Sequence, residues 1–132
     1  MKAWLMLASF AMLAVVSVPV TAQPIPKSSP MEHCFFSNQL DNWKAADAKT
    51  IYLRVSMNRY FRLVLSGPCQ ALREPGAFLI TKIHGADTIC GPVDWDLHVA
   101  TSWHDIPEAC IVKAMTELTP AEVAALPKNV KP

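Results

Sequence analysis

Two carboxylates and an imidazole occupy alternate positions late in the chain, as Asp94, Asp96 and His98. Residues at i, i+2 and i+4 of an extended strand point to the same side, so a strand here would place these side chains on one face. Such a set could hold a divalent metal ion, or could pair a carboxylate with histidine for acid–base chemistry. The alternative is the solvated face of an antiparallel strand whose intervening apolar residues face the core.

Arginine and tyrosine gather in a second segment, at Tyr52, Arg54, Arg59, Tyr60 and Arg62. The planar arginine cation and the amphipathic tyrosine ring are typical of binding hot spots. This surface could therefore bind an anionic glycan or a protein partner. The alternative is a solvated strand face on which arginine and tyrosine pack against each other across neighbouring strands.

The four cysteines are Cys34, Cys69, Cys90 and Cys110. Their spacing contains none of the close C-x₂-C pairs that zinc sites and redox motifs require, which favours two structural disulfides. Four cysteines allow three pairings, and sequence alone does not separate them. We favour Cys69–Cys90, which would join two turns beside Gly-Pro pairs, together with Cys34–Cys110, which would join the start of the domain to its final strand.

An apolar run at residues 3–18 follows Lys2 and is followed by Val20-Thr21-Ala22. A positive residue, an apolar stretch and small residues at positions −3 and −1 are typical of a secretory signal peptide. The sequence therefore predicts a signal at residues 1–22 that is removed after Ala22. Export to the periplasm or the extracellular space would place the cysteines in an oxidising environment, where disulfides persist.

Removing 22 of the 132 residues leaves 110, which suits a single domain. Three prolines within residues 23–30 predict an extended linker over residues 23–33, and we expect a folded domain at 34–127 and a frayed tail at 128–132. The 12 basic residues become 11 without Lys2, which balances the 11 acidic ones. A neutral domain lacks the positive footprint for nucleic acid, and no later apolar run is long enough to span a membrane.

Residues 50–57 alternate between apolar and polar side chains and are followed by a second β-prone run at 60–65. This pattern predicts a hairpin over residues 50–66 that reverses at Asn58-Arg59. Turn signals bound further candidate strands, which are expected at 77–83, 88–90, 94–99 and 110–115.

Two short helices are expected near the ends of the domain. Phe36, Leu40 and Trp43 follow one another at i, i+4 and i+7 and predict an amphipathic helix. Thr119 and Glu122 form a capping-box pattern and predict a helix over residues 120–126. The expected fold class is α+β, mainly β: a small disulfide-linked antiparallel sheet of four to six strands with short helices near both ends.

The order of short patterns resembles a family of small exported bacterial proteins that is classified only as a domain of unknown function. The resemblance covers residues 34–118 and rests on Cys34, Leu40, Trp43, residues 47–53 and 60–62, Pro68-Cys69-x-x-Leu72, Ile89-Cys90, Asp94 and residues 110–112. Members of the family are often predicted lipoproteins, whereas here Ala22 and not a cysteine ends the signal. The family has no established catalytic residues, so the resemblance implies a compartment and a fold but no activity.

Sequence motifs of hydrolases, nucleotide-binding proteins and zinc proteases are absent, so we assign no catalytic residue and expect no cofactor. The expected function is a small exported, non-catalytic binding or accessory module whose partner is an envelope or secreted protein. A secreted enzyme inhibitor is one alternative, and a metal-binding protein using Asp94, Asp96 and His98 is another. Trp103 lies in a loop-like stretch that ends at Pro107. It would be a contact residue if it were exposed, but a tryptophan in such a place is more commonly buried as a cap over the sheet.

Overall fold

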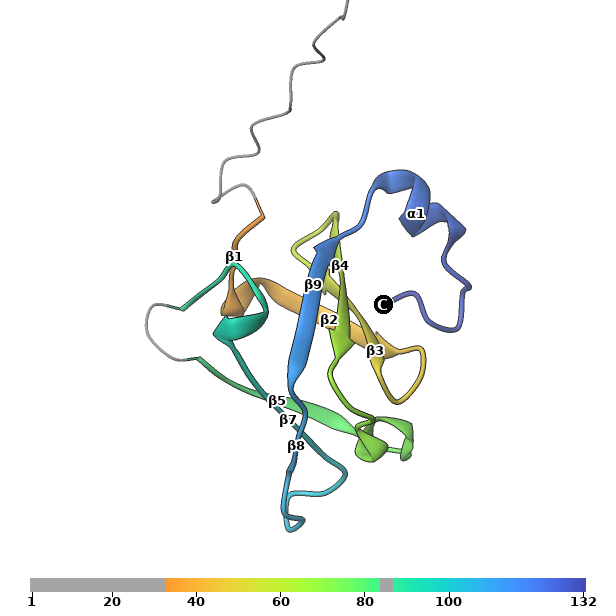
Figure 1. Ribbon diagram of the computed structural model, residues 1–132. Coiled ribbons are helices and arrows are strands. Elements are labelled where there is room, and N and C mark those ends of the chain that lie inside the picture. Colours follow the sequence, from red (N-terminus) through yellow and green to blue (C-terminus); the bar gives the residue numbers. More distant parts are fainter. Residues whose placement is uncertain (1–32, 84–86) are drawn as a thin grey trace, which may run out of the picture.

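The computed structural model describes residues 33–83 and 87–132. The expected signal peptide, and the linker before His33, lie outside the described residues. Among the described residues, no helix is long and apolar enough to cross a membrane. The described chain is mainly β, with three antiparallel sheets and few helices (Figure 1).

The largest sheet has four strands in the order β2-β3-β4-β9. Its centre is the hairpin of β3 (Thr50–Val55) and β4 (Arg59–Leu65), which confirms the predicted hairpin. The turn is at residues 56–58 and not at Asn58-Arg59, because Val55 pairs directly with Arg59. Strand β9 (Val112–Glu117) pairs with β4 and confirms the last expected strand.

The helix expected from Phe36, Leu40 and Trp43 is wrong. The chain forms only a short 3₁₀ turn, η1 (Ser37–Gln39), and then continues as strand β2 (Leu40–Ala45). The register of β2 against β3 shifts between Leu40 and Asn42, as at a β-bulge. An extra residue in the strand puts Leu40 and Trp43 three positions apart, and this spacing imitated the period of a helix.

The remaining strands form two smaller sheets. Strands β5 (Phe78–Ile83), β7 (Trp95–Ala100) and β8 (Glu108–Ala109) make one, and β1 (Phe35–Phe36) pairs with β6 (Thr88–Ile89). The 3₁₀ turn η2 (Gln70–Arg73) lies between β4 and β5, and η3 (Pro92–Asp94) lies between β6 and β7. The expected strands therefore exist, but they are divided among sheets, and the largest sheet has four strands.

The inner faces of the sheets share one hydrophobic core. Phe35 of β1 lies between the two larger sheets, with its ring centroid 4.9 Å from that of Phe61 and 6.2 Å from that of Trp95. The Trp95 indole donates a hydrogen bond to the Met115 sulfur at 3.4 Å. The alternation along β3 holds at Leu53, whose side chain is fully buried. Period-two patterning thus directs one face of the hairpin inward and leaves the other for solvent.

Helix α1 (Pro120–Ala125) confirms the predicted C-terminal helix, and Thr119 and Glu122 form the expected capping box. Residues 128–132, where the sequence predicts a frayed tail, include a turn in the structure. The amides of Val130 and Lys131 both donate to the Pro127 carbonyl, at 3.1 and 3.2 Å, and Pro132 is buried. These turn hydrogen bonds fold the C-terminal segment back, and it ends beside the four-stranded sheet (Figure 1).

Candidate functional site

The disulfides join Cys34 to Cys90 and Cys69 to Cys110. The expectation that all four cysteines are bonded is confirmed, but the favoured pairing of Cys69 with Cys90 and Cys34 with Cys110 is wrong. Strands β1 and β6 pair side by side, which brings Cys34 next to Cys90. Two disulfides in one small domain indicate an oxidising environment.

The three candidate metal ligands do not all lie on one strand. Asp96 and His98 share the outward face of β7, where the Nδ1 of His98 is 3.4 Å from an Asp96 carboxylate oxygen. Asp94 lies before the strand, in η3, and its carboxylate accepts hydrogen bonds from the amides of Cys90 and Gly91, each at 2.9 Å. Asp94 therefore caps a turn, and the metal hypothesis keeps only Asp96 and His98 as neighbours.

Within the described ranges 33–83 and 87–132, one group of potential ligands converges to within 4.8 Å: Cys69, Glu108 and Cys110. Both sulfurs belong to the Cys69–Cys110 disulfide and so are not thiolate ligands. The Glu108 carboxylate accepts hydrogen bonds from the amides of Gln70 and Ala71, at 3.2 and 2.8 Å. The group therefore ties β8 to η2 and does not form a metal centre in the disulfide-bonded protein.

The candidate binding surface on the hairpin separates into two faces. Tyr52, Arg54, Tyr60 and Arg62 lie on the outer face of the four-stranded sheet and are half-buried. Arg59 lies on the inner face because it shares the parity of Phe61 in β4. The sequence contained this signal, since Arg59 is in step with the apolar residues of its strand and the other four residues are not.

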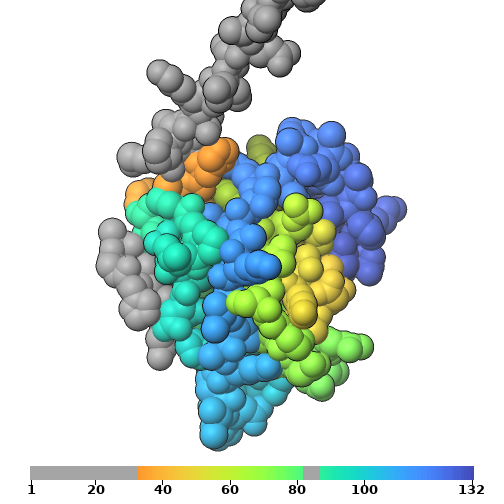
Figure 2. Space-filling view, viewed as in Figure 1, coloured from red at the N-terminus to blue at the C-terminus, as the bar shows by residue number. Residues whose placement is uncertain are grey.

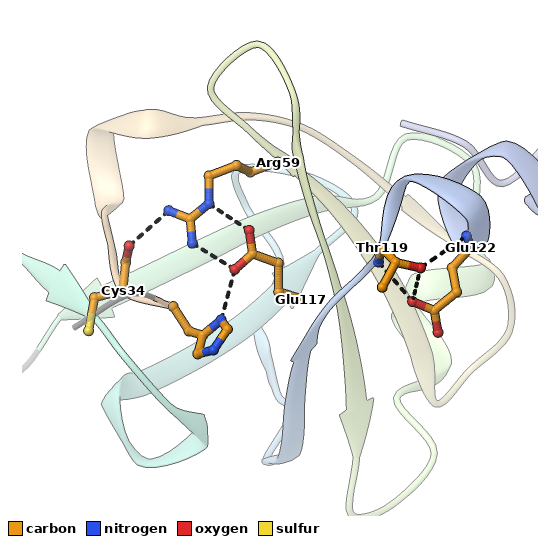
Figure 3. Close-up of polar contacts among 6 residues, drawn as sticks. Cys34, Arg59, Glu117, Thr119 and Glu122 are labelled. Atoms are coloured by element: carbon orange, nitrogen blue, oxygen red, sulfur yellow. Dashed lines mark hydrogen bonds and ion pairs between the residues drawn. The ribbon is translucent and has the colours of Figure 1, made fainter. Parts of the chain in front are cut away.

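Arg59 forms a polar cluster at the edge of the core (Figure 3). Its guanidinium makes two hydrogen bonds to the Glu117 carboxylate, at 2.7 and 2.8 Å, and a third to the Cys34 carbonyl at 3.0 Å. His33 contacts the same carboxylate at 3.0 Å. We call Arg59, Glu117, His33 and Cys34 the clamp, because they connect the start of the domain to β4 and β9.

The electrostatics of the clamp follow from the ion pair. The Arg59 hydrogen bonds are the main cause that lowers the pKa of Glu117; burial opposes them, and the His33 contact adds to the lowering. The same bonds raise the pKa of Arg59. The hydrogen bonds of the clamp join the start of the domain to β4 and β9, so the arrangement stabilises the fold. Neither Glu117 nor His33 had a diagnostic spacing in the sequence.

The most exposed large apolar side chains include two in the loop between β7 and β8, residues 101–107. Trp103 is 85% exposed and Ile106 is 96% exposed. The loop projects from the lower end of the molecule (Figures 1 and 2). The Trp103 ring packs only partly, against Phe78 at the start of β5, with centroids 4.5 Å apart. The sequence indicated that Trp103 would be a contact residue if it were exposed, but no sequence pattern pointed to Ile106.

Hydrogen bonds brace the 101–107 loop. The Thr101 hydroxyl donates to the Asp105 carboxylate at 2.7 Å, and the amides of His104 and Asp105 donate to Ser102 at 3.2 and 3.3 Å. The strand before the loop ends at the buried Ala100. The loop is therefore ordered by its own hydrogen bonds while its large apolar side chains remain exposed to solvent. We take it as the candidate contact site.

Comparison of the chain with protein-family models, with curated proteins and with solved structures finds no significant match. The resemblance to a family of exported domains stays a prediction.

Proposed function

We propose that this protein is a small exported, non-catalytic binding module that contacts an envelope or secreted protein through the 101–107 loop. The observation that carries the proposal is the exposure of Trp103 and Ile106 on a loop that local hydrogen bonds brace. Large apolar side chains exposed together mark interaction sites in soluble proteins. The two disulfides support the oxidising compartment in which such a partner would be met.

The energetics favour this site over the other exposed apolar residues. Removing an exposed isoleucine side chain from water contributes about 1.5–3 kcal/mol, and the larger tryptophan contributes more, before the cost of association is subtracted. A loop that is already ordered loses little conformational entropy on binding. Met57 and Val93 are also exposed, at 87% and 91%, but each is isolated on a different turn. Within residues 33–83 and 87–132, the 101–107 loop is the one loop that holds two of the exposed large hydrophobic side chains.

Charge favours a protein partner over a membrane surface. The segment 99–112 contains no lysine or arginine, whereas it contains Asp105 and Glu108. Loops and helices that insert into anionic lipid headgroups use basic residues around their apolar tips. A partner protein with an apolar pocket for the indole fits this loop better.

The test compares two double variants in binding to periplasmic and secreted proteins. Trp103→Ala with Ile106→Ala removes the proposed contact, and Met57→Ala with Val93→Ala is the matched control. We expect one partner that binds the wild type and the control equally, and binds the loop variant at least about 30-fold more weakly, the effect of losing about 2 kcal/mol at a hot spot. Equal affinity of the loop variant for that partner would refute the proposal.

A secreted enzyme inhibitor is the second candidate, and the convex, braced loop favours it because preorganised loops of this kind fit enzyme clefts. The Cys69–Cys110 disulfide fixes the chain close to the loop's end. Inhibition assays against secreted peptidases and glycosidases separate the two candidates. An inhibitor would block a hydrolase in stoichiometric amount and lose this effect in Trp103→Ala, whereas a binding module would leave the partner's catalysis unchanged.

A further inference from the structure

The outer face of the four-stranded sheet carries an alternating pattern of cations and aromatic rings. Tyr52 lies opposite Arg62 across β3 and β4, and Arg54 lies opposite Tyr60. Each arginine therefore has a tyrosine beside it on the neighbouring strand and the other arginine on the diagonal, within reach of long side chains. We call these four residues the Arg–Tyr face. It lies on a different sheet from the 101–107 loop, and it goes beyond the proposed function.

The arginines of this face differ from the arginine of the clamp. Arg59 makes hydrogen bonds through all three guanidinium nitrogens. The Nε atoms of Arg54 and Arg62 are buried without a hydrogen-bond partner. A buried polar atom that the fold leaves without a hydrogen bond calls for an explanation, and the Arg54 Nε has only the Asp41 carboxylate nearby, at 4.0 Å. The ends of the two forks then suit bidentate binding of a carboxylate.

Further cations surround the face. Lys44 of β2 lies opposite Tyr52, and the Lys131 ammonium lies 6.0 Å from the centre of the Tyr60 ring. Two carboxylates offset part of this charge. Asp41 lies 4.0 Å from Arg54, and Glu122 feels the charge of Arg62, although its hydrogen bonds with Thr119 are the larger influence on its pKa. The two arginines of the face and these two lysines together make four cations, against Asp41 and Glu122 beside the arginines and Glu117 in the adjoining hollow.

A hollow adjoins the face at Tyr60. It has a volume of about 450 Å³, and Tyr60, Lys131, Pro120 and Val123 are among the residues that line it. This volume falls in the range of about 300–1,000 Å³ that small-molecule sites occupy. Helix α1 contributes an apolar wall, and Glu117 also lines the hollow, which thus offers one ligand unit an aromatic ring, an apolar wall, a cation and a carboxylate.

We propose that the Arg–Tyr face binds an acidic polysaccharide that carries carboxylate groups, with one sugar unit seated in the hollow beside Tyr60. The apolar faces of sugar rings pack on tyrosine rings, while the tyrosine hydroxyls and the arginine forks bind the sugar hydroxyls and carboxylates. Repeating units along such a chain match cations and rings that alternate over the face. A nucleic acid fits poorly, because the domain after the expected signal cleavage is neutral and lacks the basic footprint of nucleic-acid binders.

The test uses isothermal titration of the disulfide-bonded domain with oligogalacturonate, and with its methyl-esterified form as the neutral control. We expect binding to the acid form that weakens at least about tenfold on methyl esterification, since esterification removes the charge that the arginines bind. Arg54→Gln with Arg62→Gln should weaken binding by at least the same factor. The matched control is Arg73→Gln, because Arg73 is exposed on η2, outside the Arg–Tyr face.

Circular dichroism and thermal melting establish that each variant folds. Tyr60→Leu is a second variant of the face, and it leaves the charge of the face unchanged. Three outcomes would overturn the proposal: equal binding of the acid and the ester, unchanged binding in the folded arginine variant, or equal binding of poly-glutamate, which would make the face a general acidic-peptide site. Trp103→Ala should bind the oligosaccharide normally, so this test and that of the 101–107 loop fail independently.

Discussion

The clamp and the 101–107 loop lie at opposite ends of the molecule, and their side chains differ in whether the fold provides them with partners (Figure 1). At the clamp, Arg59 and Glu117 pair with each other, and both also contact the start of the domain. At the 101–107 loop, Trp103 and Ile106 are exposed although hydrogen bonds hold the loop in place. Charged groups that form hydrogen bonds with one another stabilise the fold. Large apolar side chains that an ordered loop leaves exposed to water suggest a binding site for a partner.

The largest effect should come from the disulfides, one at each end of this comparison. Replacing both Cys69 and Cys110 by alanine should lower the free energy of unfolding by about 4 kcal/mol, because the bond closes a long loop and both residues are buried. Replacing Cys34 and Cys90 should cost no more, because their longer loop (sequence separation 56 against 41) adds only about 0.3 kcal/mol in the chain-entropy model, whereas these more exposed cysteines lose less packing. Urea unfolding of both double variants measures this, and a larger loss for Cys34 and Cys90 would contradict it.

Removing the clamp carboxylate should have the next largest effect. Glu117→Gln leaves Arg59 without its charged partner and should lower the free energy of unfolding at neutral pH by about 1–2 kcal/mol, reduced from a fully buried pair by partial exposure. Glu74→Gln, at an exposed position, is the control and should change little.

The effect of Glu117→Gln on the free energy of unfolding should depend on pH. The folded-state pKa of Glu117 is lowered from its ordinary value of 4.5, so its contribution is complete above that pH and is lost as the pH falls through the folded-state pKa. The difference in unfolding free energy between wild type and Glu117→Gln should therefore close as the solution is acidified below about pH 4.5. A difference that stays constant to the acid limit would show that the ion pair is not its cause.

The hairpin turn should give a small gain. Ser56 has a φ of 53°, a left-handed conformation that glycine adopts more easily than serine. Ser56→Gly should raise the free energy of unfolding by about 0.5 kcal/mol, since relief of strain exceeds the added entropy of the unfolded chain. Thermal melting tests this prediction, and a clear loss of stability would count against the turn geometry.

The smallest effect on stability is expected at the contact loop. Trp103→Ala should change the free energy of unfolding by less than about 0.5 kcal/mol, because the side chain buries little surface in the free protein. Phe61→Ala, in the core, should cost about 3–5 kcal/mol by comparison. A large loss in Trp103→Ala would assign the indole a structural role and remove the basis of the contrast.

What the sequence predicted correctly was local. Alternation placed β3 and β4, and the Thr119–Glu122 pattern placed α1, because each depends on residues a few positions apart. The disulfide pairing depends on which strands become neighbours, and the pairing of β1 with β6 joins distant segments of the chain. One bulged residue near Leu40 was enough to make a strand look helical.

The candidate site shows the same division. The hypothesis from the sequence grouped Arg59 with four residues that lie on the opposite face of the sheet. It rested on residue type and not on the alternation of side chains between the two faces of a strand. Asp94 is separated from His98 for a different reason. It is the last residue of the 3₁₀ turn before β7, and its carboxylate accepts a hydrogen bond from the Gly91 amide at the start of that turn. Trp103 could be named but not judged, because no local pattern states whether a loop tryptophan is covered.

The central claim is that the 101–107 loop is the contact surface, and a photo-cross-linking amino acid in place of Trp103 tests it most directly. Illumination with the periplasmic or secreted fraction should give one discrete cross-linked product from position 103. Excess wild-type protein should suppress this product, whereas excess Trp103→Ala should not. The same label at Met57, which is equally exposed on another turn, should give none. A product of equal yield from position 57, or no product from position 103, would contradict the account.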